Sequence, residues 1–240
     1  MKISILSYNI EGLTLEYNYC LDQSLKEYII NKSKYLIKFL KDEDADIICI
    51  QEYTPIFNIE IKDYYCVKQK PHAIFYKKSL FKYVEHTASE IYGLFVTLNI
   101  DGFLFKIGTN RLPPTPENIS LREQIMDTID KMGKEETFIY AVDTNMKKAE
   151  EKVLNNMVDC FYLASVTTGY TTIDKKTNPY FSSDNNSITR TRYDKIYCSK
   201  IFDCEQFVVI KPKTNKELVH KIYPYGGLSD HYPVLAVLTI

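Results

Sequence analysis

The chain has 240 residues and a mass of 28.0 kDa, and 45% of its residues are hydrophobic, 25% are charged and the formal net charge is −1. These ordinary globular values exclude a disordered or fibrous chain, and the small net charge argues against a protein that holds nucleic acid by bulk charge. Only eight glycines occur, and none forms a Gly-rich phosphate loop of the P-loop or Rossmann type.

Apolar stretches stay far below the roughly 18 residues that a membrane-spanning helix needs, and polar residues follow the first apolar run too soon for a signal peptide. The six cysteines form no CxxC pair. We therefore expect reduced thiols in an intracellular protein that makes no use of a membrane. The sequence leaves nuclear and cytoplasmic residence open, since no cluster of lysine and arginine resembles a localisation signal.

The first part of the chain predicts several strands and one helix. Lys2 to Ser7 is rich in β-forming residues, and Asp46 to Gln51 is typical of a buried strand. Ser24-Leu-Lys-Glu27 is a capping box, after which apolar residues recur at helical spacing up to Lys41. Asp101-Gly102 predicts a tight hairpin turn. Further strands are predicted over residues 64–68, 73–76, 81–86, 91–100 and 103–109.

The second part begins with a loop over residues 112–117, where three prolines forbid a helix. Ser120-Leu-Arg-Glu123, a second capping box, predicts a helix to about Met132, with Gly133 ending it. The remaining predicted elements are a strand over 137–142, a helix over 146–157, a polar loop over 167–187, and strands over 192–199, 205–210 and 232–240. This alternation favours one mixed α and β domain over residues 1–240.

Polar side chains stand at strand ends where a structural role would not demand them. They are Asn9, Glu11, Glu52, Asn110, Asp143, Asn145, Asp194, Asp230 and His231. Taken singly, each is more often a cap, a turn former or a packed side chain than a functional group. Taken together, they predict one site, because functional groups collect in loops at the ends of sheet strands.

The residue types at these positions indicate phosphate-ester chemistry. Oxygen ligands without cysteine or paired histidine suit a hard cation, Mg²⁺ with Mn²⁺ as a substitute, rather than zinc. A cation neutralises phosphate oxygens, a carboxylate aligns or deprotonates water, and an imidazole donates to the phosphoryl group. A buried aspartate elsewhere in the chain can hold the imidazole tautomer and raise its pKa.

Five segments, in this order, resemble the endonuclease/exonuclease/phosphatase superfamily. They are Ser7–Leu13, Ala45–Glu52, Val142–Asn145, Arg192–Ile196 and Ser229–His231. Within it, the chain is most similar to the tyrosyl-DNA phosphodiesterase 2 family. The segments that carry this likeness are Asn9–Leu13, Ala73–Ser79, Asp143–Lys147, Asn156–Asp159 and Gly169–Thr171.

The resemblance implies an α+β fold, a four-layer αββα sandwich of two packed mixed β-sheets flanked by helices. It also implies an Mg²⁺-dependent phosphodiesterase that hydrolyses the 5′-phosphotyrosyl bond between a protein tyrosine and a DNA or RNA 5′ end, leaving a 5′ phosphate. The expected partner is a single-stranded or frayed 5′ end that carries the adduct. We expect a monomer with no obligate protein partner.

The resemblance assigns the cation to acidic residues near the first two strands. Glu52 corresponds to the main metal ligand, Glu11 stands at a second acidic position, and Asp230 is a carboxylate on the metal side. Asn9 supports the metal and the phosphate.

The catalytic roles follow in the same way. Asp143 corresponds to the residue that aligns or deprotonates the attacking water, with Asn145 beside it on the phosphate. His231 corresponds to the group that donates to the transition state, and Asp194 to its partner.

Substrate contacts are expected from Arg111, Arg190 and Arg192, each of which is also a candidate for a solvated surface charge. The resemblance adds Lys147, which stands where the family tends to place an arginine. Asn110 stands where the family has a histidine that stabilises phosphoryl oxygens. An amide donates a hydrogen bond but carries no charge, and losing one such donor costs ~3 kcal/mol. A phenolate leaves more easily than an alkoxide, because the pKa of tyrosine is about 10. We therefore expect the substitution to be tolerated for aryl esters and not for alkyl esters.

Two alternatives stay open from the sequence. One is a related metal-dependent nuclease or phosphoesterase, for which residues 167–191 could line a single-strand groove with Tyr170, Tyr180 and Ile188. The other is a catalytically silent protein that binds nucleic-acid ends. The complete set of acidic, amide and histidine side chains argues against the silent binder.

Overall fold

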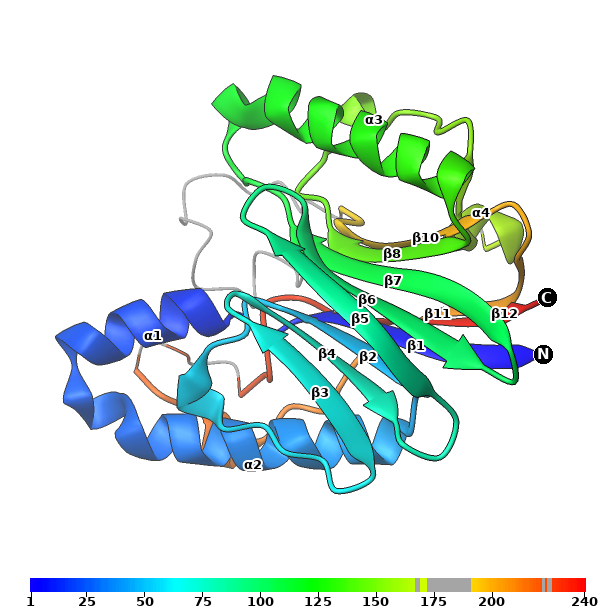
Figure 1. Cartoon of the computed structure of the whole chain (residues 1–240). Coiled ribbons are helices and arrows are strands. Elements are labelled where there is room, and N and C mark those ends of the chain that lie inside the picture. The colour runs from blue at the N-terminus through cyan, green and yellow to red at the C-terminus, as the bar shows by residue number, and fades with distance from the viewer. Residues whose placement is uncertain (167–168, 172–190, 222, 224–225) are drawn as a thin grey trace.

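Two six-stranded β-sheets pack face to face in the structure, a computed structural model that describes residues 1–166, 169–171, 191–221, 223 and 226–240 (Figure 1). The first sheet has the strand order β11-β12-β1-β2-β4-β3. Its strands are β1 (Lys2–Asn9), β2 (Ile47–Gln51), β3 (Tyr64–Gln69), β4 (His72–Lys77), β11 (Asp203–Val209) and β12 (Val234–Thr239). Within it β1 and β2 are parallel, and every other pair is antiparallel.

The second sheet has the order β5-β6-β7-β8-β10-β9 and is mixed in the same way, with β7 and β8 as its parallel pair. Its strands are β5 (Lys82–Ser89), β6 (Gly93–Ile100), β7 (Phe103–Arg111), β8 (Phe138–Asp143), β9 (Met157–Asp159) and β10 (Asp194–Ser199). Parallel neighbours need a crossover connection, which helices supply in both sheets. In each parallel pair, the carboxyl ends of the two strands therefore lie side by side at the same end of the sheet.

Helices cover the outer face of each sheet (Figure 1). The helices α1 (Gly12–Leu21) and α2 (Lys26–Glu43) connect β1 to β2, and α2 runs along the first sheet while α1 lies beyond the strand ends. Helix α3 (Ile119–Glu135) connects β7 to β8 and lies on the second sheet. A short helix, α4 (Cys160–Leu163), follows β9. The predicted α+β sandwich of four layers, α, β, β and α, is confirmed.

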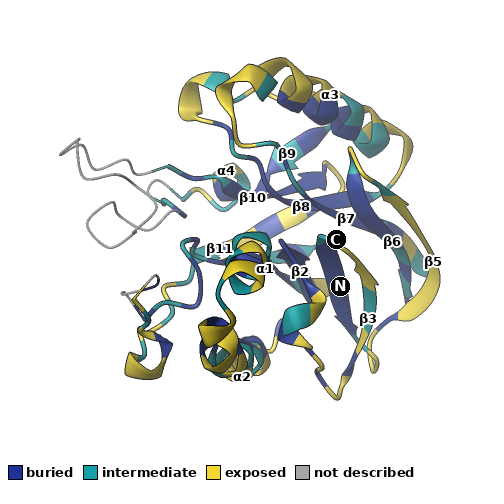
Figure 2. Cartoon of the chain, turned by 90° about the vertical axis from the view of Figure 1, so that its left-hand side faces the viewer, coloured by how far each residue is buried: buried dark blue, intermediate teal, exposed yellow. Residues whose placement is uncertain are grey.

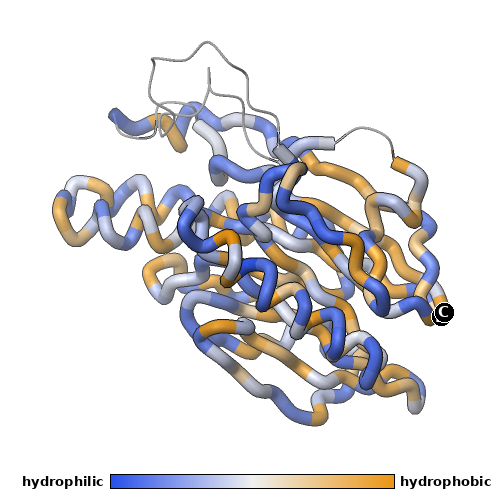
Figure 3. The backbone as a smooth tube through the Cα atoms, turned by 90° about the horizontal axis from the view of Figure 1, so that it is seen from above, coloured by the Kyte–Doolittle hydropathy of each residue, from blue (hydrophilic) through white to orange (hydrophobic). Residues whose placement is uncertain are grey.

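Alternation along the strands sorts side chains between the layers. Along β1, Ile3 and Ile5 belong to the apolar core between the two sheets, whereas Leu6 and Tyr8 belong to the core under α1 and α2. A third core lies between the second sheet and α3. The edge strand β5 is mostly exposed, while the central strands are buried (Figure 2). The strands are accordingly largely hydrophobic, and the helices alternate between hydrophilic and hydrophobic residues (Figure 3).

The predicted hairpin at Asp101-Gly102 is confirmed. Asp101 has φ 51° and Gly102 has φ 90°, and both positive values suit a two-residue turn between antiparallel strands.

The predicted helix over residues 146–157 is wrong. This stretch contains one 3₁₀ turn, Lys148–Glu150, and ends in β9, which pairs with β10. The carboxylate of Asp130 on α3 accepts hydrogen bonds from the backbone N–H groups of Asn156 and Met157, at 2.7 and 3.1 Å. These tertiary contacts hold the backbone extended against its local helical preference.

Gly133 does not end α3, which continues to Glu135. A Cβ atom at residue 133 would lie 2.2 Å from the sulfur of Met157, so the glycine allows β9 to approach the helix closely. Neither predicted capping box caps its helix. Asp22 accepts from the N–H of Ser24 in a preceding 3₁₀ turn, and the N-cap of α3 is Asn118.

Among the described residues, no helix combines the length and the apolar composition that crossing a bilayer requires.

The buried His72 gives stability a dependence on pH. It is 5% exposed at the start of β4, and burial lowers its pKa to about 4 against an opposing hydrogen bond with Asn110. Between pH about 6.5 and about 4 the unfolded chain binds a proton that the folded chain does not, so stability falls as the pH falls. We expect the free energy of unfolding to drop by roughly 3 kcal/mol across this window because of His72.

His72→Gln is expected to remove this part of the pH dependence. Urea unfolding at several pH values between 4 and 7.5 measures it, and every other titrating group is common to both proteins. Parallel stability curves for the two proteins would contradict the assignment.

Candidate active site

Polar side chains from both sheets meet where the two parallel strand pairs end. Asn9 is the last residue of β1, and Glu52 directly follows β2. Arg111 and Asp143 are the last residues of β7 and β8 and are paired in register. Asp194, at the start of β10, is paired with Asp143. The sheet topology therefore brings together residues that are distant in the sequence.

The carboxamide of Asn9 joins the two sheets. Its Nδ2 donates to Glu52 Oε1 at 3.1 Å and to Asp143 Oδ2 at 2.9 Å. Its Oδ1 accepts from the backbone N–H of Glu11 at 2.9 Å, which fixes the orientation of the amide. One neutral donor thus holds two buried carboxylates side by side.

The backbone around Glu52 is unusual. Glu52 and Glu11 have φ 55° and 57°, in the left-handed region that few residues other than glycine adopt. A Cβ atom at Gly12 would lie 2.0 Å from the carbonyl oxygen of Glu52, so the start of α1 packs directly on the end of β2. The N–H of Leu13 then donates to Glu52 Oε2 at 3.3 Å. Helix α1, which the sequence analysis did not predict, therefore positions this carboxylate.

Asn145 holds Asp143 from the other side. Its backbone N–H donates to Asp143 Oδ1 at 3.0 Å, and its Nδ2 lies 3.2 Å from Asp143 Oδ2 and donates to the carbonyl of Leu112 at 2.8 Å. With Asn9, this arrangement gives Asp143 hydrogen bonds on both carboxylate oxygens. Asp143 is fully buried and has one defined orientation.

His231 faces Asp143 and is held by Asp194. The Nδ1 of His231 lies 2.8 Å from Asp194 Oδ2, and its Nε2 lies 4.0 Å from Asp143 Oδ2. Because a carboxylate accepts only, Nδ1 carries the proton. Burial alone would lower the pKa of His231, but the charges of Asp194, Asp143 and Asp230 outweigh it and raise this pKa well above its usual value. These neighbouring charges therefore favour the cationic form of the imidazole.

A cationic group already lies between Glu52 and Asp143. The Nε of Arg111 is 2.7 Å from Glu52 Oε1 and 3.6 Å from Asp143 Oδ2. Two carboxylates that converge on one positive group form an oxygen donor set that also fits a hard divalent cation. Asp143, Asp194 and His231 also have ligand atoms within 4.8 Å of one another. Within that group, Asp194 and His231 are hydrogen-bonded to each other.

The other two predicted metal residues lie on either side of this group. The carboxylate of Glu11 is 3.5 Å from the ammonium of Lys32, which is fully buried in the helix layer. Asp230 accepts from the hydroxyl of Ser229 at 3.3 Å and lies 4.0 Å from His231 Nε2. Asp230 therefore faces the imidazole, whereas Glu11 is paired beneath the site.

Two of the residues predicted to contact substrate are instead bonded to other groups of the protein. Asn110 donates to the carbonyl of Ile91 at 2.9 Å and accepts from the N–H of Arg111 at 2.8 Å, so its amide is used inside the protein. Arg192 is buried, 2.7 Å from Asp159 and over the ring of Phe161, which keeps it away from the Asp143 cluster.

Lys147 is exposed in the segment that follows Asn145. Arg190, Tyr180 and Ile188 lie outside the described residues.

Three supporting residues were not singled out in the sequence analysis. Ser229 donates to the carbonyl of Asn9 at 2.7 Å and accepts from the N–H of His231. Thr171 accepts from the N–H groups of Tyr193 and Asp194 through its hydroxyl. The Nε2 of Gln51 reaches Ser7 on its own sheet and Thr109 on the other. The sequence contains a signal for all three, since each lies within a segment that carries the family resemblance.

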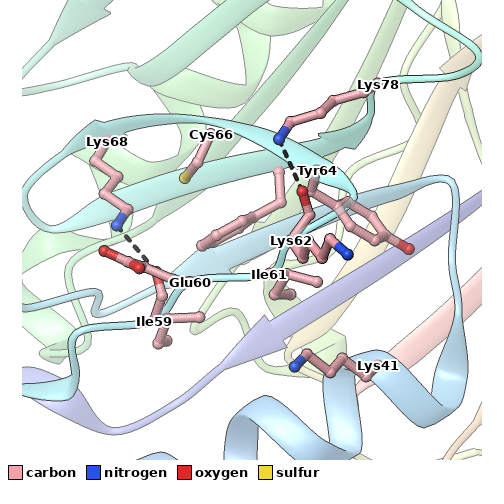
Figure 4. A pocket seen from close by; sticks show the side chains of 10 residues that line it. Lys41, Ile59, Glu60, Ile61, Lys62, Tyr64, Cys66, Lys68 and Lys78 are labelled. Atoms are coloured by element: carbon pink, nitrogen blue, oxygen red, sulfur yellow. Dashed lines mark hydrogen bonds between the residues drawn. The ribbon is translucent and has the colours of Figure 1, made fainter.

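A separate pocket of about 510 Å³ lies on the helix-facing side of the first sheet (Figure 4). Residues 59–62, strand β3 and the end of α2 line it, with four lysines at positions 41, 62, 68 and 78. Lys68 and Lys78 donate to the carbonyls of Ile59 and Lys62 (Figure 4). None of its lining residues belongs to the cluster around Asp143.

Neither a family model nor a curated protein sequence matches the chain. Solved structures do match over its whole length. A D. rerio TDP2 complexed with single strand DNA product has a TM-score of 0.78 at 19% identity, covering 100% of this chain and 99% of that chain. SeMet TDP2 from Caenorhabditis elegans has a TM-score of 0.79 at 18% identity, covering 100% and 75%.

A Bacteroides thetaiotaomicron mannosyl-6-phosphatase, Bt3783, has a TM-score of 0.72 at 17% identity, covering 99% of this chain and 100% of that chain. Another match from the same organism is an endonuclease/exonuclease/phosphatase family protein. The chain therefore has the fold shared by TDP2 structures and endonuclease/exonuclease/phosphatase family proteins.

Proposed function

We propose that residues 1–240 form one catalytic domain, a metal-dependent hydrolase that cleaves the 5′-phosphotyrosyl bond between a protein tyrosine and a DNA or RNA 5′ end and leaves a 5′ phosphate. One observation carries the proposal: a single Asn9 amide joins Glu52 to Asp143, and Asp143 faces the His231–Asp194 pair. The likeness to a TDP2 structure with single strand DNA product supports a nucleic-acid substrate.

Glu52 and Asp143 would hold the cation, Mg²⁺ or Mn²⁺, with Asp230 on the same side of the imidazole. A bound cation would neutralise non-bridging phosphate oxygens and charge developing on the leaving phenolate. The donor set contains only oxygen, as these ions prefer. Glu11 contributes through its backbone N–H, which orients the amide of Asn9.

Asp143 aligns and deprotonates the attacking water. Its two oxygens accept from Asn9 and from Asn145, so the carboxylate cannot rotate away from the attacking direction. A base held in this way contributes about 10² to 10⁴ in rate. The two amides are positioning residues, since both N–H groups of Asn9 Nδ2 are donated to Glu52 and Asp143.

His231 stabilises the phosphoryl group through Nε2, which faces Asp143. Asp194 keeps the other nitrogen protonated and fixes the ring, since their atoms are 2.8 Å apart in a buried setting. A cationic donor placed at developing negative charge is worth most where water is excluded. The leaving tyrosine needs little protonation, because the pKa of a phenol is about 10.

A panel of substrates in Mg²⁺ tests this proposal. We expect release of tyrosine from a 5′-phosphotyrosyl oligonucleotide with the strand otherwise intact and 5′-phosphorylated. Alkyl esters, namely an abasic-site duplex, a 3′-phosphorylated strand and mannose 6-phosphate, should turn over at least about tenfold more slowly. The buried amide of Asn110 supplies no charge to help an alkoxide leave.

The second candidate is a general phosphoesterase or nuclease, which the likeness to a mannosyl-6-phosphatase favours. Equal or faster turnover of the alkyl esters, or a nicked or shortened strand, would support this candidate and contradict the phosphotyrosyl assignment.

A further inference from the structure

Arg111 reaches across the boundary between the two sheets. It is the last residue of β7 in the second sheet, yet its Nε lies 2.7 Å from Glu52 Oε1, which belongs to the first. Asp143 Oδ2 is 3.6 Å from the same nitrogen. The guanidinium therefore occupies the position where the two carboxylates of the proposed cation site converge.

The contact of Arg111 with the two carboxylates is electrostatic, so another cation can take the place of the guanidinium. The Nε is buried but makes no well-aligned hydrogen bond, so directional bonding does not lock the group in place. The side chain as a whole is 28% exposed, whereas the carboxylates of Glu52 and Asp143 are 5% and 0% exposed. The guanidinium can therefore swing toward solvent without disturbing the core.

The backbone of Arg111 is fixed. Its N–H donates to Asn110 Oδ1 at 2.8 Å, and the following N–H, of Leu112, donates to the carbonyl of Asp143 at 2.8 Å. Only the long side chain is free to change position, because the backbone of Arg111 stays in place beside the site. Asn110, whose amide is committed to the backbone, thus positions its neighbour.

The carboxylates need a counter-charge at this place. Glu52 and Asp143 are both buried and both bonded to the one neutral Nδ2 of Asn9. Buried like charges this close repel each other unless a cation lies between them. His231 is already paired with Asp194 on the far side of Asp143.

We propose that Arg111 is an internal counter-cation that competes with the divalent ion for Glu52 and Asp143 and is released toward the substrate phosphate when the ion binds. This inference rests on the proposed function of the site. Arg111 then makes the site's affinity for the ion weaker than the carboxylates alone would give. It also couples the ion to the substrate, because the freed guanidinium gains a bidentate phosphate partner.

Binding of Mn²⁺ without substrate tests the inference directly. Electron paramagnetic resonance of free Mn²⁺ would give the dissociation constant of wild type, Arg111→Gln and Arg111→Lys. We expect Arg111→Gln to bind Mn²⁺ about tenfold more tightly, within the usual range of coupling between two sites. Arg111→Lys, which retains the charge, should stay near wild type.

Lys70→Gln is the matched control for loss of one positive charge. Lys70 is exposed and paired with Glu16, in the turn whose Pro71 carbonyl accepts from Tyr53, the residue after Glu52. We expect its Mn²⁺ affinity to equal that of wild type. Thermal unfolding in chelator adds a second readout, in which Arg111→Gln should lower the melting temperature and saturating Mn²⁺ should abolish the difference.

Unchanged or weaker Mn²⁺ binding by Arg111→Gln would overturn the inference, and so would an equal gain in Lys70→Gln. If wild type still hydrolysed the phosphotyrosyl oligonucleotide in either case, the proposed function would stand. Tighter binding by Arg111→Gln with no hydrolysis by wild type would uphold the competition and remove the proposed activity.

Discussion

Asp143→Asn is expected to lower the rate of 5′-phosphotyrosyl hydrolysis by about a thousandfold, close to the upper range for removal of a positioned base. Asparagine keeps the shape of the side chain, and its one oxygen can still accept from Asn9 Nδ2, whereas its amide nitrogen replaces Oδ1 and faces the N–H of Asn145. It cannot accept the proton from water, and it removes one charge from the oxygen donors shared with Glu52. Single-turnover kinetics in saturating Mg²⁺ measure the loss.

Asp127→Asn is the matched control for this variant. Asp127 is exposed on α3 and bonded to Lys152 at 2.8 Å, far from the strand ends that build the site. We expect wild-type rates from it. Oligonucleotide binding should persist in Asp143→Asn, which separates loss of chemistry from loss of substrate. An Asp143→Asn protein that is folded and still hydrolyses within tenfold of wild type would rule out Asp143 as the base.

His231→Gln is expected to lower the same rate by about 10² to 10³, the cost of removing one donor from an anionic transition state. Glutamine places an amide near the position of Nε2 but carries no charge. His86→Gln serves as the control, because His86 is exposed on the edge strand β5 and contacts Tyr83. Wild-type activity in His231→Gln would contradict the donor role.

The pH dependence of the hydrolysis rate is a second test of the role of His231. Its pKa is raised by Asp194, Asp143 and Asp230 against the lowering effect of burial, so the cationic form persists at neutral pH. Activity that needs this form should be retained below the raised pKa and lost as the pH rises through it. In Asp194→Asn, which removes the first of these charges, the alkaline loss should begin at lower pH. If activity were lost at the same alkaline pH in Asp194→Asn and in wild type, that loss would belong to another titrating group.

Much of the site could be predicted because strand ends are local features of the sequence. Asn9, Glu52 and Asp143 each follow a short apolar run, and the parallel pairing of these runs brings their ends together. The strand pattern predicted a mixed α and β domain, and the family resemblance implied the four-layer sandwich. The twelve strands of the two sheets include every strand that the pattern predicted.

Other features depend on partners that the sequence pattern does not show. The backbone after Asn145 is helical by local preference, but Asp130 of α3 binds Asn156 and Met157 and holds them extended. Arg192 follows a segment of polar sequence and resembles a surface charge, yet it is buried and bonded to Asp159. Such contacts between distant residues override local propensity, and only the assembled fold reveals them.

Arg111 was expected among the substrate contacts, but not against Glu52. The spacing of β7 places it beside Asp143, whereas its reach to the other sheet depends on how the two sheets pack. Asn110 donates to the carbonyl of Ile91, which comes just before the neighbouring strand β6 of the same sheet. Of these two adjacent residues, Arg111 is the one whose charged group lies beside Glu52 and Asp143.

The most direct measurement is hydrolysis of a 5′-phosphotyrosyl oligonucleotide by the wild-type chain, first in Mg²⁺, then in excess chelator, then after Mg²⁺ is restored. We expect tyrosine and an intact 5′-phosphorylated strand in the first and third conditions and no release in the second. Equal release in chelator, or no release by folded protein in either Mg²⁺ or Mn²⁺, would contradict a metal-dependent phosphodiesterase site built on Glu52, Asp143 and His231.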